Sequence, residues 1–140
     1  MEDTELKILI GLHRICNEAD RRTSQLAAGY GLSLGQFAVL EALYHKGDLS
    51  VGEVQRKILS SSGTMPVIVR NLEKRGLLTK SPDGEDRRRN ILHITEEGRK
   101  LIAEIFPLNK ELVLESLSPL SREEKDALLK LLKKLKRHTA

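Results

Sequence analysis

The sequence predicts a mainly helical chain with one small β-hairpin, and three observations support this fold class. Ser33, Ser50 and Ser121 are each followed three residues later by Gln or Glu, and each lies directly before a stretch in which apolar residues recur at helical spacing. This pattern is the capping box that begins helices. A turn-rich stretch at residues 81–84 separates two short β-prone segments. Apolar residues at helical spacing run along both ends of the chain.

Composition limits the class of protein. The chain has 140 residues, 31% of them charged, and a net charge of +4, which suits one domain with helical extensions. Two Phe, two Tyr and no Trp are too few for a platform that stacks bases. The single cysteine, Cys16, excludes an intrachain disulfide and a zinc site of several cysteines. Without a signal pattern or a long apolar run, we expect a cytoplasmic protein with no membrane partner.

Residues 5–28 are expected to form one long helix. Apolar or small side chains recur there at spacings of three and four residues, which is typical of a seam along one helix face. Within this helix the seam and its widening residues are Leu9, Leu12, Cys16, Ala19, Thr23, Leu26, Ile8 and Ile15. Such a wide stripe needs a cover, which must be either the C-terminal helices or a second subunit.

Three shorter helices are expected in the centre of the chain. The first runs from about Leu34 to Lys46 and the second from about Val51 to Ile58. The third begins near residues 61–63, because Pro66 is tolerated only in a first turn, and it ends at Gly76.

Two strands and two further helices complete the expected order of elements. The strands lie near Leu77–Lys80 and Asn90–Ile94. Thr95 can cap a long helix, which Pro107 should kink or break. The last helix, from about residue 122 to residue 137, carries a leucine stripe. This stripe consists of Leu128, Leu131, Leu132 and Leu135.

The third central helix has two chemically different faces. Its expected buried face consists of Met65, Ile68, Val69 and Leu72, at i, i+3, i+4 and i+7. The opposite face and its flanks carry small groups first and cations later, namely Thr64, Val67, Arg70, Asn71 and Lys74. Small polar groups suit the edges of bases in a major groove, and long cations suit phosphates. A short capped helix directly before it predicts a helix-turn-helix.

Three consecutive arginines, Arg87, Arg88 and Arg89, lie at the tip of the expected hairpin. The negative potential of a narrow minor groove attracts arginine, so such a tip can reach the groove beside the helix. The alternative is a solvated loop balanced by Glu85 and Asp86. The position directly after a helix pair favours contact with DNA.

Four stretches, Gly31–Leu40, Ser61–Leu78, Asp86–Arg88 and Ile94–Gly98, resemble the MarR family of bacterial transcriptional regulators. The resemblance implies a winged helix-turn-helix flanked by N- and C-terminal dimerisation helices. Residues 1–32 would form the N-terminal dimerisation helix, 33–98 the DNA-binding domain and 99–140 the C-terminal dimerisation helices. It also implies a homodimer that places one recognition helix in each of two successive major grooves of a pseudo-palindrome in double-stranded DNA.

The resemblance further implies which side chains contact DNA. Ser62, Thr64 and Pro66 match positions at the start of the family's recognition helix that approach bases. Arg88 matches the wing arginine that enters the minor groove, and Asp86 matches the acid that holds it. The full expected set is Ser61, Ser62, Thr64, Pro66, Val67, Arg70, Asn71, Lys74, Asp86, Arg87, Arg88 and Arg89.

Most members of this family lose DNA affinity when a small aromatic or phenolic ligand binds between the dimer region and the DNA-binding lobe. In this chain that cleft would be bordered by the first helix and the 34–46 helix. Its expected lining is Leu12, His13, Cys16, Phe37 and Tyr44. The resemblance therefore implies a repressor that such an effector releases from its operator through a shift of population.

Two alternatives stay open. A second branch of the family senses hydroperoxides or quinones through an N-terminal cysteine, which would give Cys16 a redox role. Against a close match to that branch, Cys16 lies about two helical turns later than the sensing cysteine, and the tyrosines that accompany that cysteine are absent. Separately, residues 44–48 and 105–107 resemble the corresponding stretches of repressors that respond to hydroquinone-type compounds. The alternative of another class is a winged-helix module that binds a protein.

We expect no enzyme, no cofactor and no metal site. The four histidines are dispersed without metal-ligand spacing, and no Gly-rich phosphate loop occurs.

Overall fold

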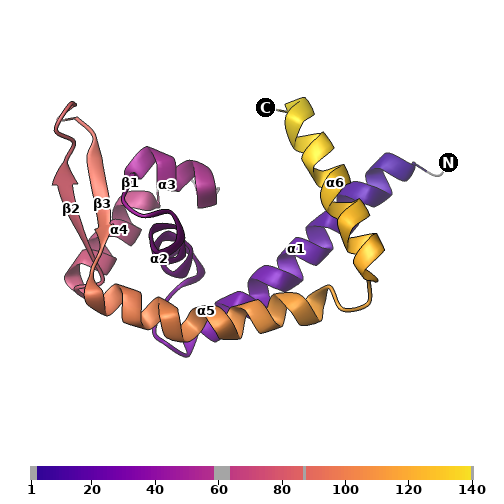
Figure 1. Cartoon of the computed structure of the whole chain (residues 1–140), viewed down its shortest axis with the longest axis horizontal. Helices are drawn as coiled ribbons and strands as arrows, with labels where there is room; N and C mark the ends of the chain where they lie inside the picture. Colours follow the sequence, from indigo (N-terminus) through magenta and orange to yellow (C-terminus); the bar gives the residue numbers. More distant parts are fainter. Residues whose placement is uncertain (1–2, 59–63, 87, 140) are drawn as a thin grey trace.

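A computed structural model describes residues 3–58, 64–86 and 88–139 of the chain. It is mainly helical, with a three-stranded antiparallel sheet, and it confirms the predicted fold class (Figure 1). A lobe of short helices and the sheet lies at one end of an elongated molecule. The long helix α5 (Glu96–Ser116) runs from the lobe toward the other end of the molecule, in contact with part of the long helix α1 (Thr4–Ala28), and α6 (Arg122–Thr139) rises from the far end of α5.

The predicted capping boxes begin three of the helices. At α2 (Leu34–Lys46) the Ser33 hydroxyl accepts from the Gln36 N–H at 3.1 Å, and the Gln36 side chain accepts from the Ser33 N–H at 2.9 Å. Ser50 and Glu53 exchange the same pair of bonds at α3 (Val51–Ile58). Ser121 and Glu124 do so before α6. These local signals therefore placed helix starts correctly.

The sheet contains one strand that the sequence did not predict. Strand β3 (Asn90–Ile94) lies in the centre, between β2 (Leu78–Pro82) and β1 (Leu49–Ser50). Strands β2 and β3 are the predicted hairpin. Strand β1 has only two residues, which is too short to show an alternating pattern, so pairing with β3 alone reveals it.

The predicted start of α4 at residues 61–63 lies outside the described residues; the structure gives α4 as Met65–Lys74 with Thr64 as its N-cap. The break that Pro107 could cause in α5 does not occur, because the helix continues through this residue. Both Pro107 and Ala103, whose carbonyl loses its helical donor, are exposed, so water can satisfy that carbonyl.

The hydrophobic core lies inside the lobe. Side chains from α2, α4, the sheet and the first half of α5 are fully enclosed there, among them Leu40, Leu43, Leu72, Leu92 and Ile102. The long helices outside the lobe expose many apolar side chains instead. Within this chain the N-terminal half of the α1 seam and the leucine stripe of α6 are exposed: Ile15 is 66% exposed and Leu131 is 58% exposed. The C-terminal half of the seam is half-buried, and Thr23 there bonds to Asn109 of α5.

No helix in the described part of the chain combines the length and the apolar character that crossing a membrane requires.

Candidate nucleic-acid interface

Helix α4 presents the two faces that its sequence pattern predicted. Met65, Val69 and Leu72 are between 0% and 4% exposed and fasten the helix to the core. Pro66 is in the first turn, where its missing N–H costs no helical bond. The residues of this helix and its N-cap that are predicted to contact DNA are all exposed, namely Thr64, Pro66, Val67, Arg70, Asn71 and Lys74. Ser61 and Ser62 lie outside the described residues.

The C-terminal end of α4 is held from two sides. The Arg75 guanidinium donates to the carbonyl of Gly31, at the junction of α1 and α2, at 2.5 Å. The Thr95 hydroxyl, at the start of α5, donates to the carbonyl of Gly76 at 2.6 Å. Gly76 has a φ of 72°, a conformation that glycine adopts without strain. The outward face of α4 is therefore fixed relative to both long helices.

The β2–β3 hairpin, called the wing below, orders an arginine at its tip. One carboxylate oxygen of Asp86 accepts from the backbone N–H of Arg88 at 3.0 Å and from its Nε at 3.2 Å. The backbone bond, followed by the side-chain bond, lowers the pKa of Asp86. The Arg88 side chain is 92% exposed, so Asp86 orients a cation that is open to a partner.

Arg89 differs from Arg88 in its contacts. Arg89 lies 3.7 Å from both Glu53 of α3 and Asp83 of the wing, so it links the hairpin to the helix pair. The Ser50 bonds lower the pKa of Glu53, and Arg89 adds to the effect. Arg87 lies outside the described residues. The balancing acids of the wing are thus Asp83 and Glu53 as well as Asp86.

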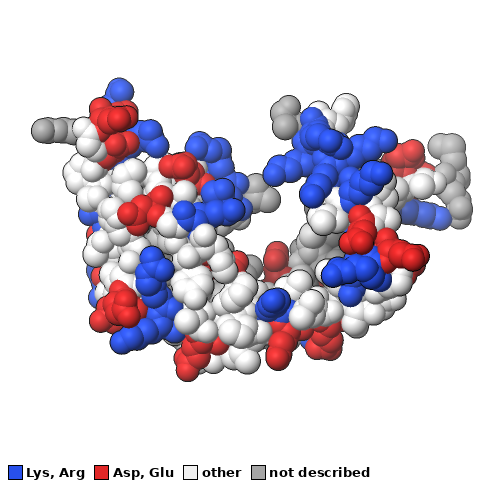
Figure 2. All heavy atoms as spheres, viewed as in Figure 1, with Lys and Arg blue, Asp and Glu red and all other residues white. Residues whose placement is uncertain are grey.

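A cationic hollow of about 630 Å³ lies between α3 and the wing. Its lining is Ser50, Val51, Gly52, Arg56, Arg88, Arg89 and Asn90. Sequence reasoning missed Arg56 and Asn90 because only the pairing of β1 with β3 brings the start of α3 beside the wing. Figure 2 shows further basic side chains over α6, at the opposite end of the molecule.

The structure does not gather the five predicted effector residues into one hollow that it describes. Phe37 is 2% exposed in the core, and Tyr44 is half-buried with its ring edge-on to His45 at 5.1 Å. His13 and Cys16 are exposed on α1, as is Leu12, at 36%. Their role in binding an effector stays a prediction.

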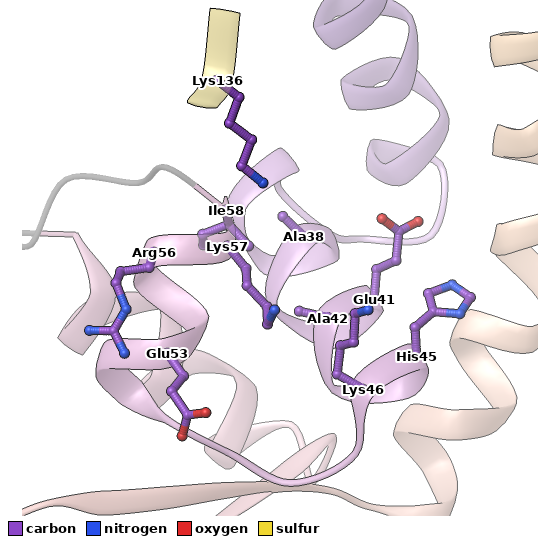
Figure 3. Close-up of a pocket in the computed structure, with 10 residues that line it drawn as sticks. All are labelled: Ala38, Glu41, Ala42, His45, Lys46, Glu53, Arg56, Lys57, Ile58 and Lys136. Atoms are coloured by element: carbon purple, nitrogen blue, oxygen red, sulfur yellow. The ribbon is translucent and has the colours of Figure 1, made fainter. Parts of the chain in front are cut away.

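A different hollow, of about 1020 Å³, opens between α2 and α3 (Figure 3). One face of α2 supplies Glu41 and His45, and Lys136 extends toward it from α6. The complete lining is Ala38, Glu41, Ala42, His45, Lys46, Glu53, Arg56, Lys57, Ile58 and Lys136. Burial raises the pKa of Glu41, and His45 partly opposes this shift. The hollow therefore combines small apolar side chains with a half-buried acid and several cations.

Comparison with known proteins identifies the family. The sequence profile of the MarR family matches residues 30–89. The HTH-type transcriptional regulator MhqR of Bacillus subtilis (strain 168) is 36% identical over 135 residues, covering 96% of this chain and 93% of its own. The regulator PecS of Dickeya dadantii (strain 3937) is 30% identical, covering 97% of this chain and 84% of its own. The chain belongs to the MarR family.

Solved structures agree with this family and fold. BpsR of Bordetella bronchiseptica, whose DNA binding is regulated by 6-hydroxynicotinic acid, superposes with a TM-score of 0.83 at 26% identity, covering 97% of both chains. A cysteine-to-serine mutant of MarR from E. coli, in complex with operator DNA, has the same fold, with a TM-score of 0.80 at 20% identity, covering 96% of this chain and 99% of its own. The protein is a DNA-binding transcriptional regulator, and its relatives are regulators rather than enzymes.

Proposed function

We propose that this regulator is a homodimeric repressor that a small hydroxylated aromatic acid or phenol releases from a pseudo-palindromic operator. The observation that carries the proposal is that one lobe exposes two elements together: the polar and cationic face of α4 and the Asp86-oriented Arg88 of the wing. In this reading, α4 lies in the major groove and Arg88 enters the adjacent minor groove.

The exposed apolar faces of the long helices support the homodimer. Leu9 and Ile15 of α1 are 51% and 66% exposed, and Leu131 and Leu135 of α6 are 58% and 53% exposed. Contiguous apolar surface of this kind marks an interface. A second copy would cover it with the same helices, which assigns dimerisation to residues 1–32 and 99–140 and DNA binding to residues 33–98.

The hollow between α2 and α3 supports an effector of this class. Ala38, Ala42 and Ile58 offer apolar contact to a ring, while Lys46 and Lys57 offer charge to a carboxylate or phenolate. BpsR, which has the same fold, is regulated by 6-hydroxynicotinic acid. Helix α3 lines the hollow and directly precedes the segment leading to α4. A ligand that prefers a position of α3 at which α4 does not fit the operator would lower operator affinity.

The test begins with a duplex selected from random DNA by the purified protein. We expect 6-hydroxynicotinic acid or 4-hydroxybenzoate to weaken binding to this duplex, measured by fluorescence anisotropy. Lys46→Ala should reduce the response to the acid without changing affinity in its absence. Lys100→Ala, an exposed lysine on α5, is the matched control. No response to any hydroxylated aromatic acid would contradict the effector proposal.

The exposed thiol of Cys16 supports one alternative, a redox switch. The same assay after treatment with cumene hydroperoxide or benzoquinone separates the two. Loss of binding in the wild type, with binding retained in Cys16→Ser, would assign the switch to the thiol. Binding that ignores both oxidants but responds to the aromatic acids would assign it to the hollow.

A further inference from the structure

A chain of hydrogen bonds crosses the exposed face of the sheet at the base of the wing. The Nδ1 atom of His93 lies 2.9 Å from a carboxylate oxygen of Asp48, and its Nε2 atom lies 2.7 Å from the hydroxyl oxygen of Ser81. His93 belongs to the central strand β3, Ser81 to β2, and Asp48 directly precedes β1. These three side chains therefore join all three strands.

The register of the sheet explains why these residues meet. Leu49 pairs with Leu92, so the next position brings Asp48 beside His93. His93 pairs with Thr79 of β2, and Ser81, two residues further on, points to the same face. The other face packs on the core, where Leu92 is 0% exposed. The three polar side chains lie on the opposite, outward face, with His93 34% and Asp48 59% exposed.

The hydrogen-bonded series Ser–His–Asp is also that of the catalytic triad of serine hydrolases, but the surroundings of Ser81 do not suit nucleophilic catalysis. A nucleophilic serine needs N–H donors for the oxyanion, commonly including that of the following residue. The residue after Ser81 is Pro82, which has no N–H. The chain of bonds is therefore better explained by what it holds in place.

What it holds is the joint between the wing and the helix pair. Strand β1 is paired to β3 over two residues only, so the Asp48–His93 contact adds one further rung to a short ladder. Ser81 extends the link to the outer strand of the wing. Besides these side chains, the joint is held by the backbone bonds of Leu49 and Ser50, by the contact of Arg89 with Glu53, and by the packing of Leu49 and Leu92 in the core.

The length of the wing amplifies any error at this joint. Arg88 is five residues from His93 and lies in the turn before β3, so at about 3.3 Å per residue the tip is at most about 16 Å from the joint. A tilt of about 10° there moves the tip by up to roughly 3 Å, several times the ~0.5 Å spread of hydrogen-bond lengths. The angle of the hairpin at His93 thus decides whether Arg88 reaches the minor groove while α4 lies in the major groove.

We propose that the Asp48–His93–Ser81 chain positions the wing, holding the hairpin at the angle at which Arg88 enters the minor groove. None of these three residues contacts DNA in this account; they act through Arg88. The inference rests on the proposed contact of Arg88 and adds the residues that make it possible.

The test measures affinity for the selected duplex by anisotropy. Asp48→Ala and Asp48→Asn remove the same charge, but Asn keeps an oxygen that can accept from His93. We expect Asp48→Ala to weaken binding about tenfold and Asp48→Asn by no more than about threefold. His93→Val should match Asp48→Ala, because it breaks both bonds and keeps a residue suited to a strand. Thr79→Ala, on the same face of β2, is the control and should stay within about twofold of wild type.

A double-mutant cycle with Arg88→Ala separates positioning from general destabilisation. If His93 acts through Arg88, adding His93→Val to Arg88→Ala should weaken binding by less than about twofold more. Equal losses of His93→Val in both backgrounds would show a merely structural role and overturn the inference. Wild-type affinity of Asp48→Ala and His93→Val beside a weakened Arg88→Ala would also overturn it, leaving the proposed function intact. Wild-type affinity of Arg88→Ala would overturn both.

Discussion

Replacing Gly98 with alanine should destabilise the lobe, although alanine normally favours a helix. Gly98 is buried in the first turn of α5, where its N–H donates to the Thr95 hydroxyl at 3.1 Å. A Cβ atom at this position would overlap the carbonyl oxygen of Leu77 and lie 2.8 Å from Cγ1 of Ile94. The Leu77 oxygen also accepts from the Thr95 N–H at 3.1 Å, so it cannot move without weakening that bond.

The magnitude follows from two opposing effects. Alanine is about 1 kcal/mol more favourable than glycine inside a helix. Overpacking a fixed site costs about 1–3 kcal/mol, and weakening the Thr95 bond adds about 1 kcal/mol. We therefore expect a net loss of about 2 kcal/mol. For a chain of this size that corresponds to a fall in Tm of roughly 5–10 °C.

Thermal unfolding followed by circular dichroism, at one fixed protein concentration, measures this change. Gly52→Ala in α3 is the matched control, because its Cβ would meet only Nη1 of Arg56, at an ordinary 3.7 Å. The control should keep or raise the Tm. A Gly98→Ala protein as stable as wild type would refute the close approach of α5 to the carbonyl of Leu77, the residue before β2.

Three further predictions follow from single side chains. Arg88→Ala should leave the Tm unchanged, because the side chain is 92% exposed. It should weaken operator binding by about 1–3 kcal/mol in an anisotropy titration. Unchanged affinity would show that Arg88 of the wing does not contact DNA. Thr64→Ala should cost about 1–3 kcal/mol at one base position of each half-site, whereas an equal loss on random duplex would indicate a phosphate contact instead. Burial raises the pKa of Glu41 above its ordinary 4.5, so the folded state holds this proton more tightly than the unfolded state does. The charged carboxylate then reduces stability as the pH rises above 4.5, and Glu41→Gln should raise the Tm above that pH but not below it; a Tm difference that does not vary with pH would contradict this.

Local signals predicted much of the fold. The Ser33 and Ser50 capping boxes act within four residues, so α2 and α3 begin where the sequence places them. The start of α4 was less determined, because consecutive serines before Thr64 offer several caps. Helix α5 passes Pro107 because packing on both sides holds it, with Ile105 buried in the lobe and Asn109 bonded to Thr23 of α1.

The parts that the sequence did not predict depend on contacts between distant segments. Strand β1 exists only as a partner of β3, and Asp48 and His93 meet only through that register. The sequence also did not predict the hollow between α2 and α3. Apolar spacing along α2 indicates that Phe37 is buried, but it does not say whether Phe37 faces a cleft or the core, where the structure places it.

The central claim is that this chain binds DNA through α4 and the wing, and the salt dependence of its binding to the selected duplex tests it most directly. Contacts with several phosphates release counterions, so the account predicts that affinity falls by about a thousandfold or more between 50 mM and 200 mM salt. It also predicts a shallower slope for Arg88→Ala, by about one unit for each lost contact. A change in affinity of less than about threefold over this range, for wild type and variant alike, would contradict the account and indicate an apolar interface instead.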